Sequence, residues 1–128
     1  MTHIDHIGII VADLEQAAAR LAVLFGEPRF KELAEVGLRV AEFQASNVRI
    51  ELLQYSGDAA FAREVMGERL GLNHISARVA NADAAIAELT GAGFEPMPGF
   101  PRQGAHGKVA FFRPDAASGL LFEVCEED

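Results

Sequence analysis

The sequence has little of several features that mark particular classes of protein. It contains a single cysteine, Cys125, which excludes an intrachain disulfide. The net charge is -8, which argues against nucleic-acid binding through phosphate contacts. The longest near-continuous apolar run, about Ile7 to Ala12, is far shorter than the roughly 20 residues of a membrane-spanning helix. The N-terminus also lacks a basic region followed by an apolar run, so these absences together predict a protein of the cytoplasm.

The sequence contains enough hydrophobic residues to form a hydrophobic core. Half of the 128 residues are hydrophobic and 23% are charged, which is the composition of a folded chain rather than a disordered one. A chain of this length leaves little room for a second core. We therefore expect one domain that spans residues 1–128.

The two halves of the chain resemble each other. Ile4-Asp5-His6-Ile7 near the start reappears as Leu72-Asn73-His74-Ile75 near the midpoint. Each segment alternates as a strand does and is followed by a polar break that leads into a helix. This repeat predicts two modules, about residues 1–56 and 71–128, with a helical linker over 57–70.

Each module is predicted to have the order β-α-β-β-β. Apolar residues at spacings of three and four predict a helix over 14–25, which Asp13 caps and Gly26 ends, and a second helix from Ala82 to near Gly91 or Gly93. Each helix is followed by a short segment ending in Pro, at 25–28 and 93–96, that permits only an edge strand or a turn. The further strands are expected at about 36–43, 48–55, 108–113 and 120–125. The fold class is therefore α+β, with tandem βαβββ modules that form a curved mixed sheet and with helices on one side.

Strand parity brings one histidine and one glutamate to the same face of each module. Side chains alternate along a strand, so His6 lies opposite the apolar row of Ile7, Ile9 and Val11, and His74 repeats this arrangement. On the last strand of each half, Glu51 and Glu123 lie opposite apolar residues in the same way. If the two halves pack about a pseudo-two-fold axis, these four side chains converge.

Two imidazoles and two carboxylates form a donor set that suits Co, Ni, Zn, Mn or Fe. Taken singly, a histidine or glutamate in a strand is more often hydrogen-bonded or partly exposed than bound to a metal. However, two glutamates within apolar strands are costly to bury without a cation or a water-filled cavity. The pattern also occurs twice, so we predict a metal site at His6, Glu51, His74 and Glu123.

Over nearly the whole chain, the sequence resembles the vicinal oxygen chelate superfamily, and within it the methylmalonyl-CoA epimerases. The most specific stretches are residues 101–114 and 119–126, joined by Asp5-His6-Ile7-Gly8-Ile9, Ile50-Glu51-Leu52-Leu53 and the segment around His74. The resemblance implies paired βαβββ modules around a divalent metal. It also makes the same four residues, His6, Glu51, His74 and Glu123, the metal ligands.

The chain departs from this pattern at two positions. Some epimerases have Gln where this chain has Glu51, whereas the related glyoxalase I has Glu, so the ligand set alone does not separate the two activities. Some epimerases also carry a glutamate base at what corresponds to Val40. Glu42 lies two residues further on the same face, but a solvated charge at the rim is the favoured interpretation of this residue.

The resemblance implies epimerisation of methylmalonyl-CoA through an enolate. Glu51 and Glu123 would be the catalytic carboxylates, and Arg102 with the loop Gly104, Ala105, His106 and Gly107 would contact the acyl-CoA thioester substrate. Lys108, Arg102 and Arg113 are candidates for contact with the coenzyme A phosphates. Arg39 and Arg49 are interpreted as surface charges, and Cys125 as a buried small residue.

Two other functions remain open at this point. The first is glyoxalase I-type isomerisation of a glutathione hemithioacetal, which uses the same enolate chemistry. The second is metal-free binding of a small molecule such as an antibiotic, which the presence of all four ligands disfavours. Exposed strand edges, together with the frequent dimerisation of family members, also predict a homodimer.

Overall fold

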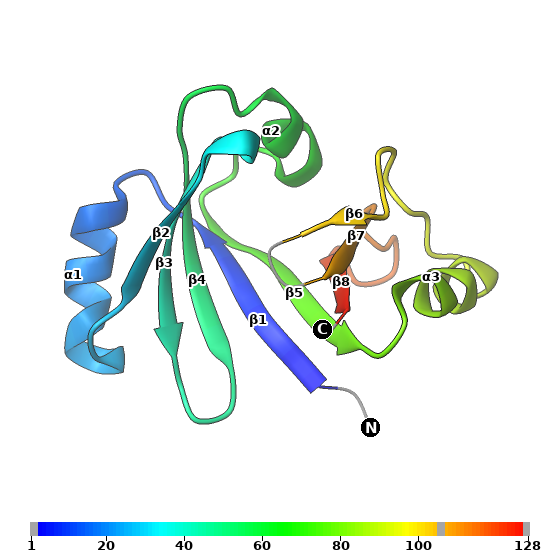
Figure 1. Cartoon of the computed structure of the whole chain (residues 1–128), viewed down its shortest axis with the longest axis horizontal. Coiled ribbons are helices and arrows are strands. Elements are labelled where there is room, and N and C mark those ends of the chain that lie inside the picture. The colour runs from blue at the N-terminus through cyan, green and yellow to red at the C-terminus, as the bar shows by residue number, and fades with distance from the viewer. Residues whose placement is uncertain (1–2, 105–106, 127–128) are drawn as a thin grey trace. The chain divides into compact units, whose positions relative to one another are not determined.

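The computed structural model describes residues 3–104 and 107–126 of the chain. The chain divides into a first unit, His6–Asn73, and a second unit, formed by Met1–Asp5 with His74–Asp128. In both units the strand pairs are of mixed direction and helices pack on the sheet, which confirms the α+β class (Figure 1). Among the described residues, no helix is long and apolar enough to cross a membrane.

The first unit is built on four strands and two α-helices. Its strands lie in the order β2-β3-β4-β1, with β1 parallel to β4 and the other neighbours antiparallel. The elements are β1 (His3–Ile10), α1 (Leu14–Phe25), β2 (Arg29–Leu33), the 3-10 turn η1 (Ala34–Val36), β3 (Leu38–Gln44), β4 (Arg49–Tyr55) and α2 (Ala60–Met66). Helix α1 starts and ends where the sequence predicts, because Asp13 accepts a hydrogen bond from the Gln16 amide and Gly26 follows the last turn.

The two faces of this first sheet have different roles. On one face, α1 packs over a core that contains Leu14, Ala18, Ala41, Phe43 and Leu52, all 0–1% exposed. The opposite face carries Ile10, Val40 and Leu53 against Ala62 of α2, so its end near α2 is apolar. This face carries the even-numbered residues of β1 and β3 and the odd-numbered residues of β4. His6, on β1, therefore lies on it. The face that carries His6 is therefore apolar at one end and polar at the other.

The second unit repeats this plan. Its strands lie in the order β5-β8-β7-β6, with β5 parallel to β8. Its elements are β5 (Gly71–Val79), α3 (Ala82–Gly91), β6 (Arg102–Gln103), β7 (Lys108–Phe112) and β8 (Leu121–Glu126), of which the first three residues of β5 are counted with the first unit. Ala110, Phe112 and Val124 form the core on the face of α3, together with Ile86 and Leu89 of that helix.

The edge strands and the linker helix differ from the sequence predictions. The segment 25–28 consists of the last residue of α1 and three residues outside any helix or strand, and the edge strand begins only at Arg29, after Pro28. In the second unit, segment 93–96 contributes a single bridge, between Pro96 and Phe112, and the edge strand is the two-residue β6. The linker helix α2 packs on the face that carries His6, so helices cover both faces of the first sheet.

Candidate metal centre

His6 and Glu51 form a close pair within the first unit. Strand β1 runs parallel to β4 with His6 opposite Arg49 and Gly8 opposite Glu51, so both side chains project from one face. The Nε2 atom of His6 lies 3.6 Å from Oε1 of Glu51, and His6 is 7% exposed. Gly8 adds no side chain between them. The strand parity inferred from the sequence therefore does place this pair on one face.

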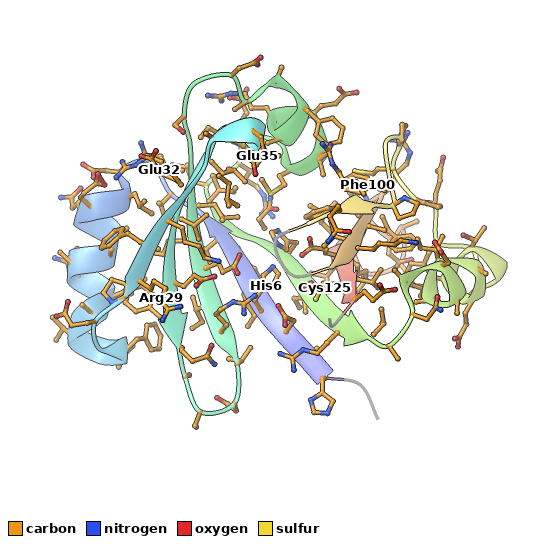
Figure 2. All side chains as sticks on the ribbon, in the orientation of Figure 1. His6, Arg29, Glu32, Glu35, Phe100 and Cys125 are labelled. Atoms are coloured by element: carbon orange, nitrogen blue, oxygen red, sulfur yellow. The ribbon has the colours of Figure 1, made fainter. Side chains whose placement is uncertain are left out.

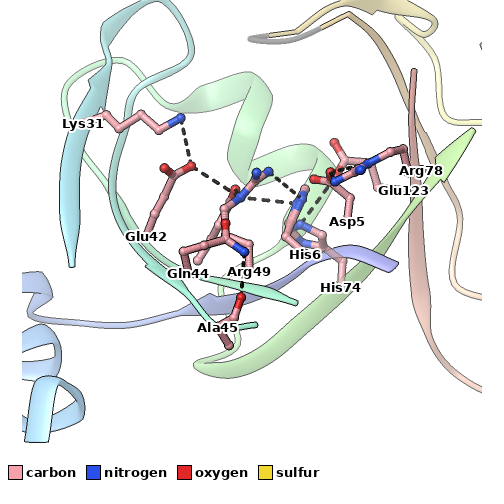
Figure 3. A network of polar contacts seen from close by, with 11 residues as sticks. Asp5, His6, Lys31, Glu42, Gln44, Ala45, Arg49, His74, Arg78 and Glu123 are labelled. Carbon is pink, nitrogen blue, oxygen red and sulfur yellow. Dashed lines mark hydrogen bonds and ion pairs between the residues drawn. The ribbon is translucent and has the colours of Figure 1, made fainter. Parts of the chain in front are cut away.

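Three further charged side chains surround this pair. Arg49 Nε lies 2.9 Å from Glu51 Oε2 and 3.6 Å from Glu42 Oε2, and Lys31 Nζ lies 2.9 Å from Glu42 Oε2 (Figure 3). The Glu42 and Arg49 side chains are 11% and 18% exposed, so the interpretation of both as solvated surface charges is wrong. The register explains the cluster, because Glu42 stands directly opposite Glu51 and two adjacent carboxylates require cations. Arg39 is more exposed and pairs with Glu15 at the surface, as expected.

His74 and Glu123 form the corresponding pair within the second unit. Strand β5 runs parallel to β8, and Ser76 stands opposite Glu123 as Gly8 stands opposite Glu51. The Nε2 atom of His74 lies 3.8 Å from Oε1 of Glu123, and the two residues are 4% and 7% exposed. The ring of Phe111 meets the His74 ring edge-on, with centroids 5.0 Å apart. This pair is thus buried beside an aromatic side chain.

The two histidine and glutamate pairs have different residues at equivalent neighbouring positions of the sheet. The position opposite the histidine is Arg49 in the first unit and Leu121 in the second. The position opposite the glutamate on the adjacent antiparallel strand is Glu42 in the first unit and Phe111 in the second. At these two register positions, the same backbone plan therefore gives the first pair charged neighbours and the second pair apolar ones.

Each pair has the chemistry and spacing of a half-site for a metal ion. His6, His74 and Glu123 are buried donors that each offer one ligand atom, and Glu51 adds a second carboxylate. Two ligand atoms that both lie ~2.1 Å from one ion are roughly 3 to 3.5 Å apart. The observed histidine-to-glutamate separations of 3.6 and 3.8 Å come within a few tenths of an ångström of this range. The residues therefore fit a divalent metal ion with little rearrangement.

The loop predicted to bind substrate is described in part. Ala105 and His106 lie outside the described residues. Arg102 is exposed on β6, and the Gly104 amide donates a hydrogen bond to the Gly107 carbonyl over 2.7 Å. A Cβ atom at Gly104 would lie 2.8 Å from Cγ1 of Val109, so a side chain there would require Val109 to move. The roles of this loop toward a substrate stay predictions.

Asp5 and Arg78 form an ion pair in the second unit that the sequence did not single out. Asp5 Oδ1 accepts hydrogen bonds from Nε and Nη2 of Arg78 at 3.1 and 2.9 Å. Asp5 stands one position before His6 on β1, and Arg78 stands four positions after His74 on β5. Their opposite charges were visible in the sequence, but their proximity depends on how β1 contributes to the second unit.

Cys125 lies on β8 (Figure 2). We expect its thiol to be a poor nucleophile. Burial is the main cause that raises the pKa of this thiol to about 11, and a hydrogen bond with Ser76 opposes the shift. At pH 8 we expect iodoacetamide to alkylate the folded protein at least a hundredfold more slowly than the urea-unfolded protein, measured by mass spectrometry. The pKa of the thiol is higher in the folded protein than in the unfolded protein. Its contribution to the free energy of unfolding is therefore fully present below about pH 9 and is lost as the pH rises to about 11. Equal alkylation rates in the two states would contradict this account.

Comparisons with known proteins agree with the geometry. Residues 5–112 match the glyoxalase/bleomycin resistance protein/dioxygenase superfamily. An uncharacterised protein of Bacillus subtilis (strain 168), YqjC, is 31% identical over 98% of this chain and 93% of its own. The mitochondrial methylmalonyl-CoA epimerase of Homo sapiens is 32% identical over 94% of this chain and 72% of its own. A solved variant of methylmalonyl-CoA epimerase from Streptomyces coelicolor, in complex with 2-nitronate-propionyl-CoA, has a TM-score of 0.79 at 27% identity and covers 99% of this chain and 95% of its own.

Proposed function

The chain belongs to the glyoxalase/bleomycin resistance protein/dioxygenase superfamily, and from this premise we propose that it epimerises methylmalonyl-CoA with a divalent metal ion. The observation that carries the proposal is the histidine and glutamate pair that each unit holds on equivalent strands, in which His6, His74 and Glu123 are buried. Relatives named as methylmalonyl-CoA epimerases support the choice of substrate. The ligand of the Streptomyces coelicolor variant is an acyl-CoA whose nitronate group is planar and anionic, as an enolate is.

We propose that His6, Glu51, His74 and Glu123 hold one ion together. Each pair alone supplies two ligands, whereas catalytic sites for transition metals usually combine three or four protein ligands with open positions. The equivalent strand positions of the two pairs support a shared ion, because duplicated units can contribute equally to one site. A divalent metal suits this donor set, and the same residues accept Co, Ni, Zn or Mn.

The protein's own residues would manage the proton of the α-carbon. Epimerisation removes that proton from one face of the carbon and returns one to the other face, so it needs a proton acceptor near the substrate. Glu123 is the better acceptor, because it is the more buried carboxylate, with 9% of its side chain exposed against 14% for Glu51, and its neighbours in register are Ser76 and Phe111. When bound, a divalent ion supplies the positive charge that stabilises an enolate. The low exposure of both histidines would keep bulk water from competing for the proton.

Glyoxalase I-type activity on a glutathione hemithioacetal is the second candidate. Glu51 favours it, because this chain has the carboxylate that glyoxalase I has and that some epimerases replace by Gln. The named epimerase relatives favour the first candidate. The two reactions share the enolate chemistry, so the substrate is what distinguishes them. The homodimer and the cytoplasmic location stay predictions.

Proton exchange in deuterated buffer tests the proposed function. We expect cobalt-loaded protein to remove the α-hydrogen signal of methylmalonyl-CoA from the proton NMR spectrum and to collapse the methyl doublet, because each turnover replaces that hydrogen with deuterium. Protein treated with a chelator and dialysed is the matched control, and its exchange should fall toward the rate without protein.

Three outcomes separate the candidates. Rapid exchange with cobalt-loaded protein supports the epimerase. Absence of exchange, with turnover of the glutathione hemithioacetal, would replace it by the glyoxalase-type lyase. A purified protein that neither contains nor takes up a metal and acts on neither substrate would instead support metal-free binding of a small molecule.

A further inference from the structure

Arg49 contacts both candidate ligands of the first unit. Its Nε atom lies 2.9 Å from Glu51 Oε2, and its Nη2 atom lies 3.4 Å from Nδ1 of His6 (Figure 3). A guanidinium has hydrogen-bond donors and no acceptor, and it keeps its positive charge at any pH at which the protein is folded. The atoms with which Arg49 interacts therefore act as acceptors toward it.

The contact with His6 conflicts with the binding of a metal ion through Nε2. If Nδ1 accepts a hydrogen bond from Arg49, the single proton of the neutral imidazole is on Nε2. That proton then faces Glu51 Oε1, which is 3.6 Å away. A metal ion binds a ring nitrogen that carries no proton, and the other nitrogen then normally donates to an acceptor. Arg49 cannot be that acceptor, so its contact with Nδ1 must break when Nε2 binds an ion.

Glu42 offers Arg49 an alternative partner nearby. The Nε atom of Arg49 is 3.6 Å from Glu42 Oε2, only 0.7 Å further than from Glu51 Oε2 at 2.9 Å. Lys31 holds Glu42 in place from β2, with Nζ 2.9 Å from the same oxygen. A small movement of the guanidinium thus exchanges one carboxylate for the other without leaving Arg49 unpaired, which would be costly at 18% exposure.

The second unit has apolar residues at both positions. Leu121 is the residue opposite His74, as Arg49 is the residue opposite His6. Phe111 is the residue opposite Glu123, as Glu42 is the residue opposite Glu51. The repeat thus provides an internal comparison: the histidine and glutamate pair does not need these charged neighbours in order to fold. Arg49 and Glu42 therefore have a role that is particular to the first pair.

We propose that Arg49 competes with the metal ion for Glu51 and His6, and that it transfers to Glu42 when the ion binds. This inference rests on the proposed metal site and makes Arg49 a positioning residue that sets the affinity for the ion. In the first unit, Arg49 must therefore be displaced before the ion binds His6 and Glu51.

The test is direct measurement of cobalt affinity by competition with a chromophoric chelator. Arg49→Met, which keeps an apolar stem and removes the charge and the donors, should bind cobalt about tenfold more tightly, or ~1.4 kcal/mol. Glu42→Gln should bind cobalt at least about threefold more weakly, because Arg49 then lacks its second carboxylate. Arg39→Met is the matched control, since Arg39 pairs with Glu15 at the surface, and its affinity should equal that of the wild type.

Nitrogen NMR of the imidazole rings gives an independent readout. In the metal-free wild type at neutral pH, we expect His6 to carry its proton on Nε2, and Arg49→Met should reduce the population of this tautomer. Arg49→Lys, which keeps the charge but not the fork of donors, provides a second variant with an intermediate affinity if Arg49→Met fails to fold.

The outcomes distinguish this proposal from the proposed function. Equal or weaker cobalt binding by Arg49→Met, in a wild type that binds cobalt, would overturn the competition and leave the epimerase proposal intact. A His6 ring with its proton on Nδ1 in the metal-free protein would overturn it as well. A wild type that binds no divalent ion would remove both the competition and the metal-dependent function.

Discussion

Replacement of Glu123 by Gln is expected to lower the rate of α-proton exchange of methylmalonyl-CoA by about a thousandfold, which is typical of the loss of a general acid or base. The amide has nearly the same shape as the carboxylate, but it neither accepts the proton nor carries the charge. Glu123 is 7% exposed and lies beside His74, so few alternative bases reach the same position. Exchange is followed by proton NMR in deuterated buffer, and cobalt content is measured on the same samples.

Two controls make this result specific. Glu95→Gln removes an exposed carboxylate, 70% accessible, from the same unit and should leave the exchange rate unchanged. Glu51→Gln should cost far less than Glu123→Gln, because the amide oxygen of Gln still offers a ligand atom and some epimerases have Gln at this position. A Glu51 variant as inactive as the Glu123 variant would contradict the assignment of Glu123 as the main proton acceptor. Loss of cobalt from the Glu123 variant would attribute the effect to ligation instead.

Replacement of Phe112 by Ala should lower the free energy of unfolding by about 3–5 kcal/mol. Phe112 is fully buried, with 0% exposure, in the core that joins β7 and β8 to α3. Its ring meets that of Phe94 edge-on, with centroids 6.5 Å apart, so the truncation removes an aromatic contact and leaves a cavity. Urea denaturation followed by circular dichroism measures the change.

Phe30 provides the matched control for this substitution. It is 52% exposed on the edge strand β2, so Phe30→Ala removes the same atoms without opening a buried cavity. We expect its cost to be below ~1 kcal/mol, as for surface substitutions in general. A cost for Phe112→Ala no larger than this would contradict the placement of Phe112 in the core of the second unit.

The sequence predicts best where a pattern is local. The helix over 14–25 is correct to the residue, because its apolar spacing, the cap at Asp13 and the stop at Gly26 act within a few residues of one another. Strand parity is likewise local, and it places His6 with Glu51 and His74 with Glu123 on common faces. The edge strands are not predicted well. The length of an edge strand depends on how many residues of the neighbouring strand are available for backbone hydrogen bonds, and this is a long-range property.

The surroundings of the first pair depend on long-range register, which the sequence does not display. Arg49 and Glu51 are two residues apart on β4, so their shared face could be read from the sequence. That Glu42 stands opposite Glu51 follows only from the pairing of β3 with β4. A charged residue on a strand is usually solvated, and this general tendency led to the wrong interpretation of Glu42 and Arg49 as surface charges. The substrate loop, with Ala105 and His106 outside the described residues, stays a prediction.

Strand β1 serves both units, and this has a consequence for how the protein can be divided. Asp5 belongs to the second unit, where it pairs with Arg78, whereas the next residue, His6, belongs to the first unit and pairs with Glu51. A fragment that starts at His74 would therefore expose the guanidinium of Arg78 without its carboxylate. Although its two halves resemble tandem copies, a cut between them separates Arg78 from Asp5, so we expect the second piece to be less stable than the same residues in the intact chain. A circular permutant that keeps residues 3–10 continuous is the more suitable route to relocating its termini.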